Sequence, residues 1–449
     1  MIQQLVILGA TGDLTARYLL PALGALRTAG HLDEGFGLTG VGREDWTDET
    51  FRTWAAEQLD RHAPGVPAEQ RRAVATAARY RRADVTDADA LAAAIPRDEP
   101  VAAYLALPPS IFPATASALH AAGTAKGSTI VLEKPFGESL HDAVELNRLL
   151  SELYEERSIY RVDHFVAMAT VLNLLGVRLA NRVLEPIWSS SHIERIDIIW
   201  DESLALEGRA GYYDGVGALK DMLQNHLLQL LCLVAMEPPI SLGERDLRDR
   251  KVDVLRSIRP LTLDDAARRT RRARYSAGAC VPAYVDEPGV DPAHHTETFA
   301  ELLLEVDNWR WRGTVFRLRT AKAVRVNRHE IAVHFRAVPH LPFGEGVTAE
   351  PNVLRFGLEP ETVSLHLTGT STHADGLVPL TLAATPAPGA LPPYGRLLLN
   401  VLKGDTALSI RADEAEESWR VVTPVLEAWA KDLVPLEEYP AGSEGPAPR

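Results

Sequence analysis

The sequence predicts two domains: an N-terminal α/β domain with a Rossmann-like, doubly wound sheet, and a C-terminal α+β domain with a large antiparallel sheet. The chain of 449 residues is longer than one hydrophobic core usually organises. Strand-like apolar runs alternate with helix-like stretches rich in Ala and Leu over roughly the first 160 residues, as in a parallel sheet covered by helices. Beyond them, alternating strand-like segments follow with few helices between, as in an antiparallel sheet. We therefore expect one domain at residues 1–163 and a second at residues 164–449.

In the N-terminal domain, the expected strands are short apolar runs at residues 5–8, 36–41, 101–107 and 129–132. In the C-terminal domain, helix-like patterns cover residues 169–181 and 219–236. The strands expected there lie at residues 193–200, 300–307, 315–319, 330–335, 353–358 and 362–367. The Pro- and Gly-rich stretch 384–395 is expected to be a loop before a helical C-terminal region, and residues 440–449 a loose tail.

The composition disfavours several classes of protein. Apolar residues make up 46% of the chain and charged residues 24%, which is typical of a globular protein. A net charge of −14 disfavours nucleic acid or an anionic membrane as the main partner. Two cysteines are too few for a disulfide framework or a thiolate zinc site, and the sequence has neither a secretion signal nor a long apolar run. We expect a soluble, cytoplasmic protein that can still bind a small anion in a local pocket.

A glycine turn follows the first strand directly and opens a helix. Gly9, Thr11 and Gly12 would let backbone N–H groups and the positive helix N-terminus meet a pyrophosphate. The spacing is Gly-x-x-Gly rather than the three-glycine fingerprint, so a plain strand-to-helix turn stays an alternative. The second strand is followed by Arg43, which favours NADP over NAD because an arginine there accommodates the 2′-phosphate. Arg43 could instead be a solvated surface cation, and the adjacent Glu44 could turn outward or contest the phosphate.

These features belong to a longer series of motifs that resembles the glucose-6-phosphate dehydrogenase family nearly from end to end. The most recognisable is Glu-Lys-Pro-Phe-Gly at residues 133–137. The others stand in the family's order and approximate spacing at residues 9–14, 104–109, 161–164, 207–209, 212–214, 221–226, 307–311 and 441–443. The resemblance implies NADP-dependent oxidation of a glucose-type pyranose at C1 to the 1,5-lactone. It also implies cofactor binding in residues 1–163, and substrate binding and assembly into a homodimer or homotetramer in residues 164–449.

The resemblance further implies a catalytic pair, with His226 as general base on the C1 hydroxyl and Asp163 orienting it. This chemistry needs a proton acceptor beside the oxygen while hydride leaves C1, and histidine serves near neutral pH without a metal. A carboxylate behind the imidazole fixes its tautomer and stabilises the imidazolium. The polar face at whose edge His226 lies, in the helix expected at residues 219–236, could also be a solvated stripe.

The remaining site residues are carried over from the family position by position. Lys134 is expected to contact sugar and cofactor, with Pro135 in cis, although it could be a surface lysine at a turn. Cofactor contacts are expected from Gly9, Thr11, Gly12, Asp13, Leu14, Arg43, Leu107, Pro108 and Lys134. Substrate contacts are expected from Lys134, His164, Glu202, Asp221 and Lys322. Either Glu202 or Asp221 could instead take part in a structural ion bridge.

Three residues of the expected substrate site depart from the family pattern. The family's phosphate-binding helix Asp-His-Tyr-Leu-Gly-Lys reads Asp-His-Phe-Val-Ala-Met here, so Phe165 and Met168 replace a phenol and a cation. Glu359 stands where the family has a neutral glutamine amide. A charge-assisted hydrogen bond contributes on the order of 1.5–3 kcal/mol, so these changes would weaken phosphate binding by roughly 3–6 kcal/mol.

We therefore expect a sugar that is unphosphorylated at C6, or one that carries an amine there. Two alternatives stay open. An arginine from elsewhere could rebuild the phosphate site of an ordinary glucose-6-phosphate 1-dehydrogenase, since His164 and Lys322 are kept. The chain could also be a non-catalytic NADP or sugar sensor, although a pure binding module has no need of the retained base at C1.

Overall fold

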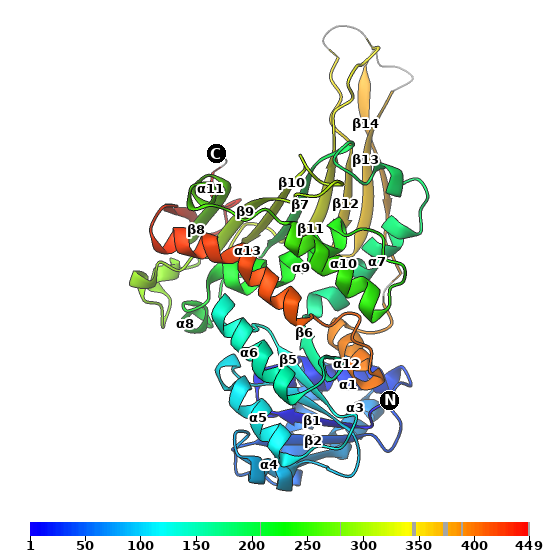
Figure 1. Ribbon diagram of the computed structural model, residues 1–449, viewed down its shortest axis with the longest axis vertical. Helices are drawn as coiled ribbons and strands as arrows, with labels where there is room; N and C mark the ends of the chain where they lie inside the picture. The colour runs from blue at the N-terminus through cyan, green and yellow to red at the C-terminus, as the bar shows by residue number, and fades with distance from the viewer. Residues whose placement is uncertain (207, 279, 344–346, 371–375, 388, 448–449) are drawn as a thin grey trace. The chain divides into compact units, whose positions relative to one another are not determined.

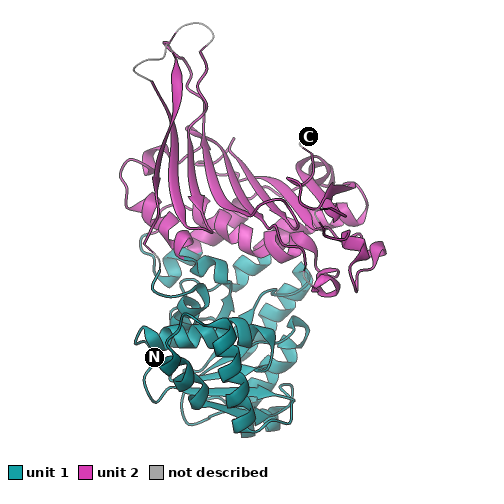
Figure 2. Cartoon of the chain, turned by 180° about the vertical axis from the view of Figure 1, so that it is seen from behind, with its two compact units in different colours: residues 1–168, 240–248, 388–416 teal, residues 169–239, 249–387, 417–449 magenta. Residues whose placement is uncertain are grey.

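The computed structural model describes residues 1–206, 208–278, 280–343, 347–370, 376–387 and 389–447. Glu207, part of one family motif, lies outside them. The chain divides into two compact units, unit 1 with residues 1–168, 240–248 and 388–416 and unit 2 with residues 169–239, 249–387 and 417–449 (Figure 2). Each unit is therefore built from three separate stretches of chain. The roles expected for residues 1–163 and 164–449 stay predictions.

Unit 1 is built on a parallel sheet in the strand order β3-β2-β1-β4-β5-β6 (Figure 1). Its strands are β1 (Gln4–Leu8), β2 (Gly37–Gly42), β3 (Ala78–Arg82), β4 (Val101–Leu105), β5 (Thr129–Glu133) and β6 (Ile159–Val162). This is the doubly wound order: the chain adds strands toward one edge from β1 to β3, and from β4 onward it adds them toward the other edge. The expected Rossmann-like domain is confirmed. The strand expected at 101–107 ends at Leu105.

Helices cover both faces of this sheet. One apolar cluster packs α1 (Leu20–Thr28), α2 (Asp48–His62), α3 (Ala68–Ala77) and α12 (Pro393–Lys403). A second cluster packs α4 (Ala88–Ala94), α5 (Phe112–Ala122) and α6 (Leu140–Leu153). The side chains of β1 are buried on both faces, which explains its unbroken apolar run. Shorter helical turns are η1 (Thr15–Leu19), η2 (Pro109–Ile111), η3 (Glu156–Ser158) and η4 (His164–Ala167).

Unit 2 is built on a mixed sheet in the strand order β14-β13-β12-β11-β7-β10-β9-β8-β15. Its strands are β7 (Ile193–Asp201), β8 (Thr270–Ser276), β9 (Phe299–Glu305), β10 (Val315–Ala321), β11 (Arg328–Phe335), β12 (Val353–Gly357), β13 (Thr362–Thr370), β14 (Leu377–Ala384) and β15 (Leu436–Pro440). Within the described residues its neighbours pair antiparallel, except that β7 pairs with β10 and β8 with β15 in parallel. The expected large antiparallel sheet is thus confirmed, with two parallel pairings added.

The helices of unit 2 are α7 (Ala169–Leu179), α8 (Ala210–Tyr213), α9 (Leu228–Ala235), α11 (Leu263–Arg269), the π-helical η6 (Leu219–Leu227) and the short turns η5 (Glu185–Ile187), η7 (Tyr284–Asp286) and η8 (Pro292–His294). Residues of both units contribute to α10 (Glu244–Ser257) and α13 (Ala412–Ala430). The continuous helix formed by η6 and α9 is held at both ends. Leu219 N–H donates to Glu297 Oε1 over 2.9 Å, and the indoles of Trp188 and Trp311 donate to the last carbonyls of α9.

The expected loose tail at residues 440–449 is wrong for the residues that the structure describes. Ala441 N–H donates to the Ser276 carbonyl over 3.0 Å, and Gly442 N–H to the Ala323 carbonyl over 2.7 Å. The backbone hydrogen bonds of this segment, which sequence composition does not reveal, hold it beside β8 and the end of β10. The loop expected at 384–395 is also shorter than foreseen, because α12 begins at Pro393.

No helix among the described residues is long and apolar enough to cross a bilayer.

The glycine turn after β1 is held in close contact with the end of β4. Gly9 has φ +84°, and a Cβ there would lie 2.3 Å from the Ala106 carbonyl oxygen and 2.9 Å from a Leu107 methyl carbon. We expect Gly9→Ala to destabilise the protein by roughly 1–3 kcal/mol more than Gly30→Ala, since crowding adds to backbone strain. Gly30 has φ +72°, but a Cβ there would meet nothing within 4 Å, so it reports backbone strain alone. Denaturant titrations measure the free energy of unfolding. If Gly9→Ala and Gly30→Ala lower it equally, the close contact at Gly9 is contradicted.

Candidate active site

The glycine turn joins β1 to the first helix of unit 1. Gly9 and Ala10 N–H both donate to the Val41 carbonyl of β2, over 2.9 and 3.1 Å, and Gly12 N–H donates to the Gly9 carbonyl over 3.2 Å. These bonds fix the turn beside the carboxyl end of β2. Leu14 is the N-cap of η1, and the first N–H groups of a helix are directed out of its N-terminal end. The side chain of Asp13 is exposed and pairs with Arg17 at 2.8 Å.

Two charged residues follow β2. Arg43 and Glu44 are both exposed, and the carboxylate of Glu44 accepts a hydrogen bond from Tyr80 Oη over 3.0 Å. Burial opposes ionisation, but hydrogen bonds from its own backbone, Tyr80 and Thr11 together hold the pKa of Glu44 below its usual value. The carboxylate of Glu44 thus lies beside Thr11 of the glycine turn, and whether it contests a 2′-phosphate stays a prediction.

The Glu-Lys-Pro-Phe-Gly motif begins at the last residue of β5. The bond between Lys134 and Pro135 is cis, as expected. Tyr104 Oη donates a short hydrogen bond to Glu133, and Tyr394 is hydrogen-bonded to the same carboxyl group. Desolvation of this largely buried group raises the pKa of Glu133 to about 7, and the charge of Asp163 adds to the effect. At neutral pH a substantial part of Glu133 is therefore protonated.

The segment after β6 carries the departures from the family pattern. Asp163 is 1% exposed, and its Oδ1 accepts the Phe165 N–H over 2.9 Å, which caps η4. The expected helix is a single 3₁₀ turn here, and Met168 follows it in extended backbone rather than on the face of His164. Phe165 is buried, and Met168 adds no charge. The residues expected to bind phosphate thus present one imidazole, that of His164, from this turn.

Aromatic rings hold His164 in place. Its ring stacks on Tyr394 of α12 with centroids 5.1 Å apart and planes at 19°. Tyr394 in turn stacks on Tyr18 with centroids 5.0 Å apart. Because Tyr394 also bonds Glu133, one side chain of α12 links the ends of β5 and β6.

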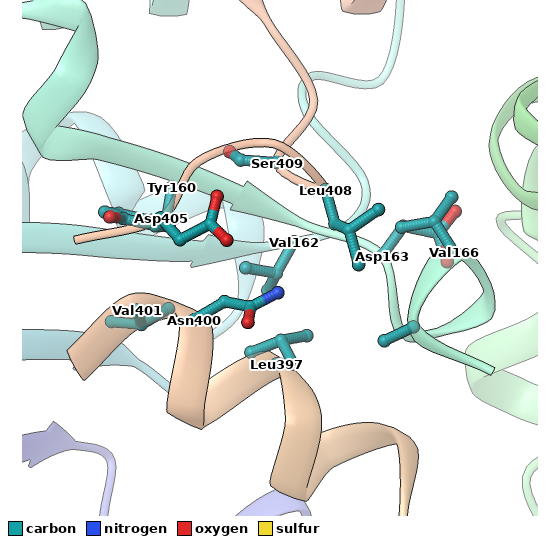
Figure 3. A pocket seen from close by; sticks show the side chains of 11 residues that line it. Tyr160, Val162, Asp163, Val166, Leu397, Asn400, Val401, Asp405, Leu408 and Ser409 are labelled. Atoms are coloured by element: carbon teal, nitrogen blue, oxygen red, sulfur yellow. The ribbon is translucent and has the colours of Figure 1, made fainter. Parts of the chain in front are cut away.

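A small cavity lies beside Asp163, between the end of β6 and helix α12 (Figure 3). Its volume is about 20 Å³, roughly the space that one water molecule needs. It is lined by Tyr160, Val162, Asp163, Val166, Ala167, Leu397, Asn400, Val401, Asp405, Leu408 and Ser409. This cavity is too small for a sugar or a nucleotide.

In unit 2, three of the expected substrate residues come together where several strands begin or end. Glu202 and Lys322 follow the carboxyl ends of the parallel neighbours β7 and β10, and they form an ion pair. Trp200 Nε1 donates to Glu202 Oε1 over 3.0 Å, and His329 of β11 stacks on Trp200 with ring centroids 3.8 Å apart. Glu359, two residues after β12, places Oε2 3.7 Å from Nδ1 of His329. We call these five residues the unit 2 cluster.

The helix with the expected base is largely buried. Gln224, Asn225, His226 and Gln229 are at most 5% exposed, so the interpretation of this face as a solvated stripe is wrong. The π-helical η6 also departs from the 3.6-residue period on which that face was drawn, and such segments occur often at functional sites. Asp221, in the first turn, is partly exposed. Asp163 belongs to unit 1 and His226 to unit 2, so their pairing stays a prediction.

Sequence reasoning missed several residues at the edge of the unit 1 sheet and in the unit 2 cluster. Tyr104 and Glu133 lie inside recognised motifs, which could have drawn attention to them. Tyr394 and His329 carry no such signal, because nothing local in the sequence shows that α12 returns to unit 1 or that His329 faces Trp200 across the sheet.

Comparison with known proteins decides the family. The profile described as "Glucose-6-phosphate dehydrogenase, NAD binding domain" matches residues 6–173, and "Glucose-6-phosphate dehydrogenase, C-terminal domain" matches residues 175–449. This chain belongs to the glucose-6-phosphate dehydrogenase family. The resemblance seen in the motifs is confirmed, and membership of this family supports NADP as the cofactor.

Relatives in the family align over nearly the whole chain. The glucose-6-phosphate 1-dehydrogenase of Treponema pallidum (strain Nichols) is 38% identical over 98% of this chain and 92% of its own. That of Zymomonas mobilis is 34% identical over 99% and 96%. A solved glucose-6-phosphate dehydrogenase in complex with glucose 6-phosphate superposes with a TM-score of 0.90 at 28% identity, covering 99% of this chain and 96% of that one. The enzyme from Mycobacterium avium gives 0.88 at 33% identity, covering 99% and 95%.

The position of Glu44 predicts an effect on cofactor preference. Glu44→Gln is expected to raise the preference for NADPH over NADH by about tenfold, roughly 1.4 kcal/mol, because the amide no longer repels a 2′-phosphate yet still accepts from Tyr80. Dissociation constants from fluorescence titration with both nucleotides would measure it. Glu57→Gln, an exposed change on α2, is the control. An unchanged ratio in Glu44→Gln would mean that this carboxylate does not face the bound ribose.

The raised pKa of Glu133 predicts a pH-dependent effect on stability. A carboxyl whose pKa is raised from 4.5 to about 7 stabilises the fold below pH 4.5 and loses that contribution as the pH rises through 7. Glu133→Gln does not titrate and keeps an acceptor for Tyr104. Its stability relative to the unaltered protein should therefore increase by up to roughly 3 kcal/mol between pH 5 and 8. Thermal unfolding across this range is the measurement, with exposed Glu138→Gln as control; a pH-independent difference would contradict the shift.

Proposed function

We propose that this protein oxidises a glucose-type pyranose at C1 to the 1,5-lactone with NADP, and that it favours a sugar without a phosphate at C6. Membership of the family and the retained Asp163, Lys134 and His226 support the reaction. The observation that carries the substrate preference is the turn after β6, where Phe165 and Met168 stand in place of a phenol and a cation.

The residues at the edge of the unit 1 sheet fit a dinucleotide. Space for the pyrophosphate comes from Gly9, Thr11 and Gly12, with Asp13 and Leu14 at the helix N-terminus. Arg43 lies on the side where a 2′-phosphate would bind, and Leu107 and Pro108 follow the neighbouring strand. When bound, NADP supplies the hydride acceptor.

In the proposed reaction, the C1 alcohol loses one hydrogen as a proton and the other as hydride. His226 takes the proton of the hydroxyl, and two electrons leave C1 with the other hydrogen as hydride. Asp163 orients the imidazole and stabilises its protonated form. The hydrogen bond from Phe165 N–H to Oδ1 supports this role, because it fixes the carboxylate in one orientation. Lys134, Glu202 and Asp221 are proposed to hold the sugar hydroxyls.

The loss of the two phosphate ligands corresponds to roughly 3–6 kcal/mol, or about two to four orders of magnitude in affinity. Glu359 adds a negative charge to the unit 2 cluster. The runner-up is an ordinary glucose-6-phosphate 1-dehydrogenase, which the retained His164 and Lys322 favour, together with the names of the relatives. A homodimer or homotetramer stays a prediction from the family resemblance.

The test is NADP reduction with glucose 6-phosphate, glucose and amino-glucoses, in the unaltered protein and in Met168→Lys. We expect kcat/KM for the unphosphorylated sugars to exceed that for glucose 6-phosphate by about tenfold or more, and Met168→Lys to shift preference toward the phosphate ester. Val144→Lys, which adds the same charge on the exposed face of α6, should change nothing.

His226→Asn separates catalysis from binding in this experiment. It should abolish turnover while leaving the NADPH dissociation constant unchanged. If glucose 6-phosphate is the best substrate of the unaltered protein, the runner-up is correct. If no sugar is oxidised although NADPH binds tightly, the protein is a sensor.

A further inference from the structure

Two members of the unit 2 cluster, His329 and Glu359, have no part in the reaction proposed above. His329 is 8% exposed, and its ring lies flat on the indole of Trp200 with an interplanar angle of 6°. Within the described residues, neither ring nitrogen makes a hydrogen bond of good geometry, although the Asp201 backbone lies close enough to raise the pKa of the ring. Nδ1 instead faces Glu359 Oε2 at 3.7 Å, which is beyond hydrogen-bond distance. A buried imidazole with one poorly bonded nitrogen is costly, so a ligand that donates to the nitrogen acting as acceptor is favoured here.

The backbone explains why these two side chains meet. His329 pairs with Trp200 across β11 and β7, so the rings project from one face of the sheet. The Leu358 N–H donates to the His329 carbonyl over 2.8 Å, which brings the segment after β12 beside the start of β11. The next residue is Glu359, whose side chain is 70% exposed and therefore accessible to a ligand.

The charges of the unit 2 cluster are only partly balanced by opposite charges within it. Lys322 is paired with Glu202, so these two charges cancel locally. Burial lowers the pKa of His329, and the carboxylates of Glu359 and Glu202 oppose this only in part. His329 is therefore neutral at pH 7, and the charge of Glu359 is left without a counter-charge from the ring that it faces. An imidazole nitrogen and a carboxylate oxygen thus lie 3.7 Å apart, close enough for one N–H donor group to reach both.

We infer that His329 and Glu359 form a subsite for a cationic N–H donor, and that the sugar oxidised by this protein carries an ammonium group at C6; this rests on the function proposed above. An ammonium group donates to the carboxylate and to the ring nitrogen at once. A phosphate in the same place is repelled by Glu359, and a hydroxyl gains a hydrogen bond but no charge attraction. Trp200 fixes the ring by stacking, so the acceptor is in place before the sugar binds.

The experiment compares 6-amino-6-deoxyglucose, glucose and glucose 6-phosphate, by NADP reduction and by calorimetric binding. In the unaltered protein we expect the amino sugar to bind and react about tenfold better than glucose. Glu359→Gln should remove that advantage, so that the ratio of kcat/KM for the amino sugar to that for glucose falls to about one. Glu361→Gln, which removes a charge from the same turn, is the matched control and should keep the advantage.

A second variant tests the ring. His329→Phe keeps the stack on Trp200 but has no acceptor, so it should lower kcat/KM for the amino sugar more than for glucose. A loss of folding alone would lower kcat/KM equally for both sugars. The result with Glu359→Gln would then decide.

The two readouts separate this inference from the proposed function. If amino sugar and glucose bind equally well, or if Glu359→Gln weakens both alike, the cationic subsite is overturned while oxidation of unphosphorylated sugar stands. If the amino sugar binds in a manner that depends on Glu359 but no NADPH forms, the subsite is supported and the proposed reaction fails. Preference for glucose 6-phosphate in the unaltered protein would overturn both.

Discussion

The arrangement of unit 1 depends on one close approach, that of the Gly9 backbone to the carbonyl of Ala106. A parallel sheet brings the carboxyl ends of its strands to one edge, so the segments after β1, β4, β5 and β6 crowd together there. Space for a cofactor remains only if the turn after β1 carries no side chain at its tightest point. Lys134 follows β5 and Asp163 follows β6, so both lie at the same edge of the sheet as this contact.

Unit 2 uses the same geometric rule in a sheet of mixed direction. Its parallel pair, β7 and β10, ends at the point where the antiparallel β11 begins and β12 has just finished. Residues that lie more than 150 positions apart, Trp200 and Glu359, are therefore brought to one ring, His329. The antiparallel neighbours β7, β11 and β12 make this convergence, and the parallel pairing of β7 with β10 adds Lys322 beside Glu202.

The fold was predictable where a pattern is local. Apolar runs identified four strands of unit 1, and the turn from Gly9 to Gly12 located the nucleotide edge. The long-range pairing of β15 with β8, and the return of α12 to unit 1, follow from contacts that no local pattern encodes. In the site, residue types and the cis bond before Pro135 were predictable through motifs, whereas the backbone of the turn after β6 was not. The helix expected after His164 is a 3₁₀ turn, because Asp163 caps it by bonding Phe165 N–H and the backbone extends again at Met168.

The two carboxyl groups at the unit 1 edge accept hydrogen bonds from different donors, and Glu133 has a raised pKa. Asp163 accepts a backbone N–H, a donor that stabilises a carboxylate. Burial raises the pKa of Glu133, which accepts from tyrosine hydroxyls, and the charge of Asp163 adds to the rise. A proton on Glu133 therefore relieves the repulsion between two neighbouring acids without neutralising the one assigned to the base. It also leaves the charge of Lys134 less compensated, which favours an anionic cofactor at the same edge. The different hydrogen-bond donors of these two acids thus follow from which strand end each occupies.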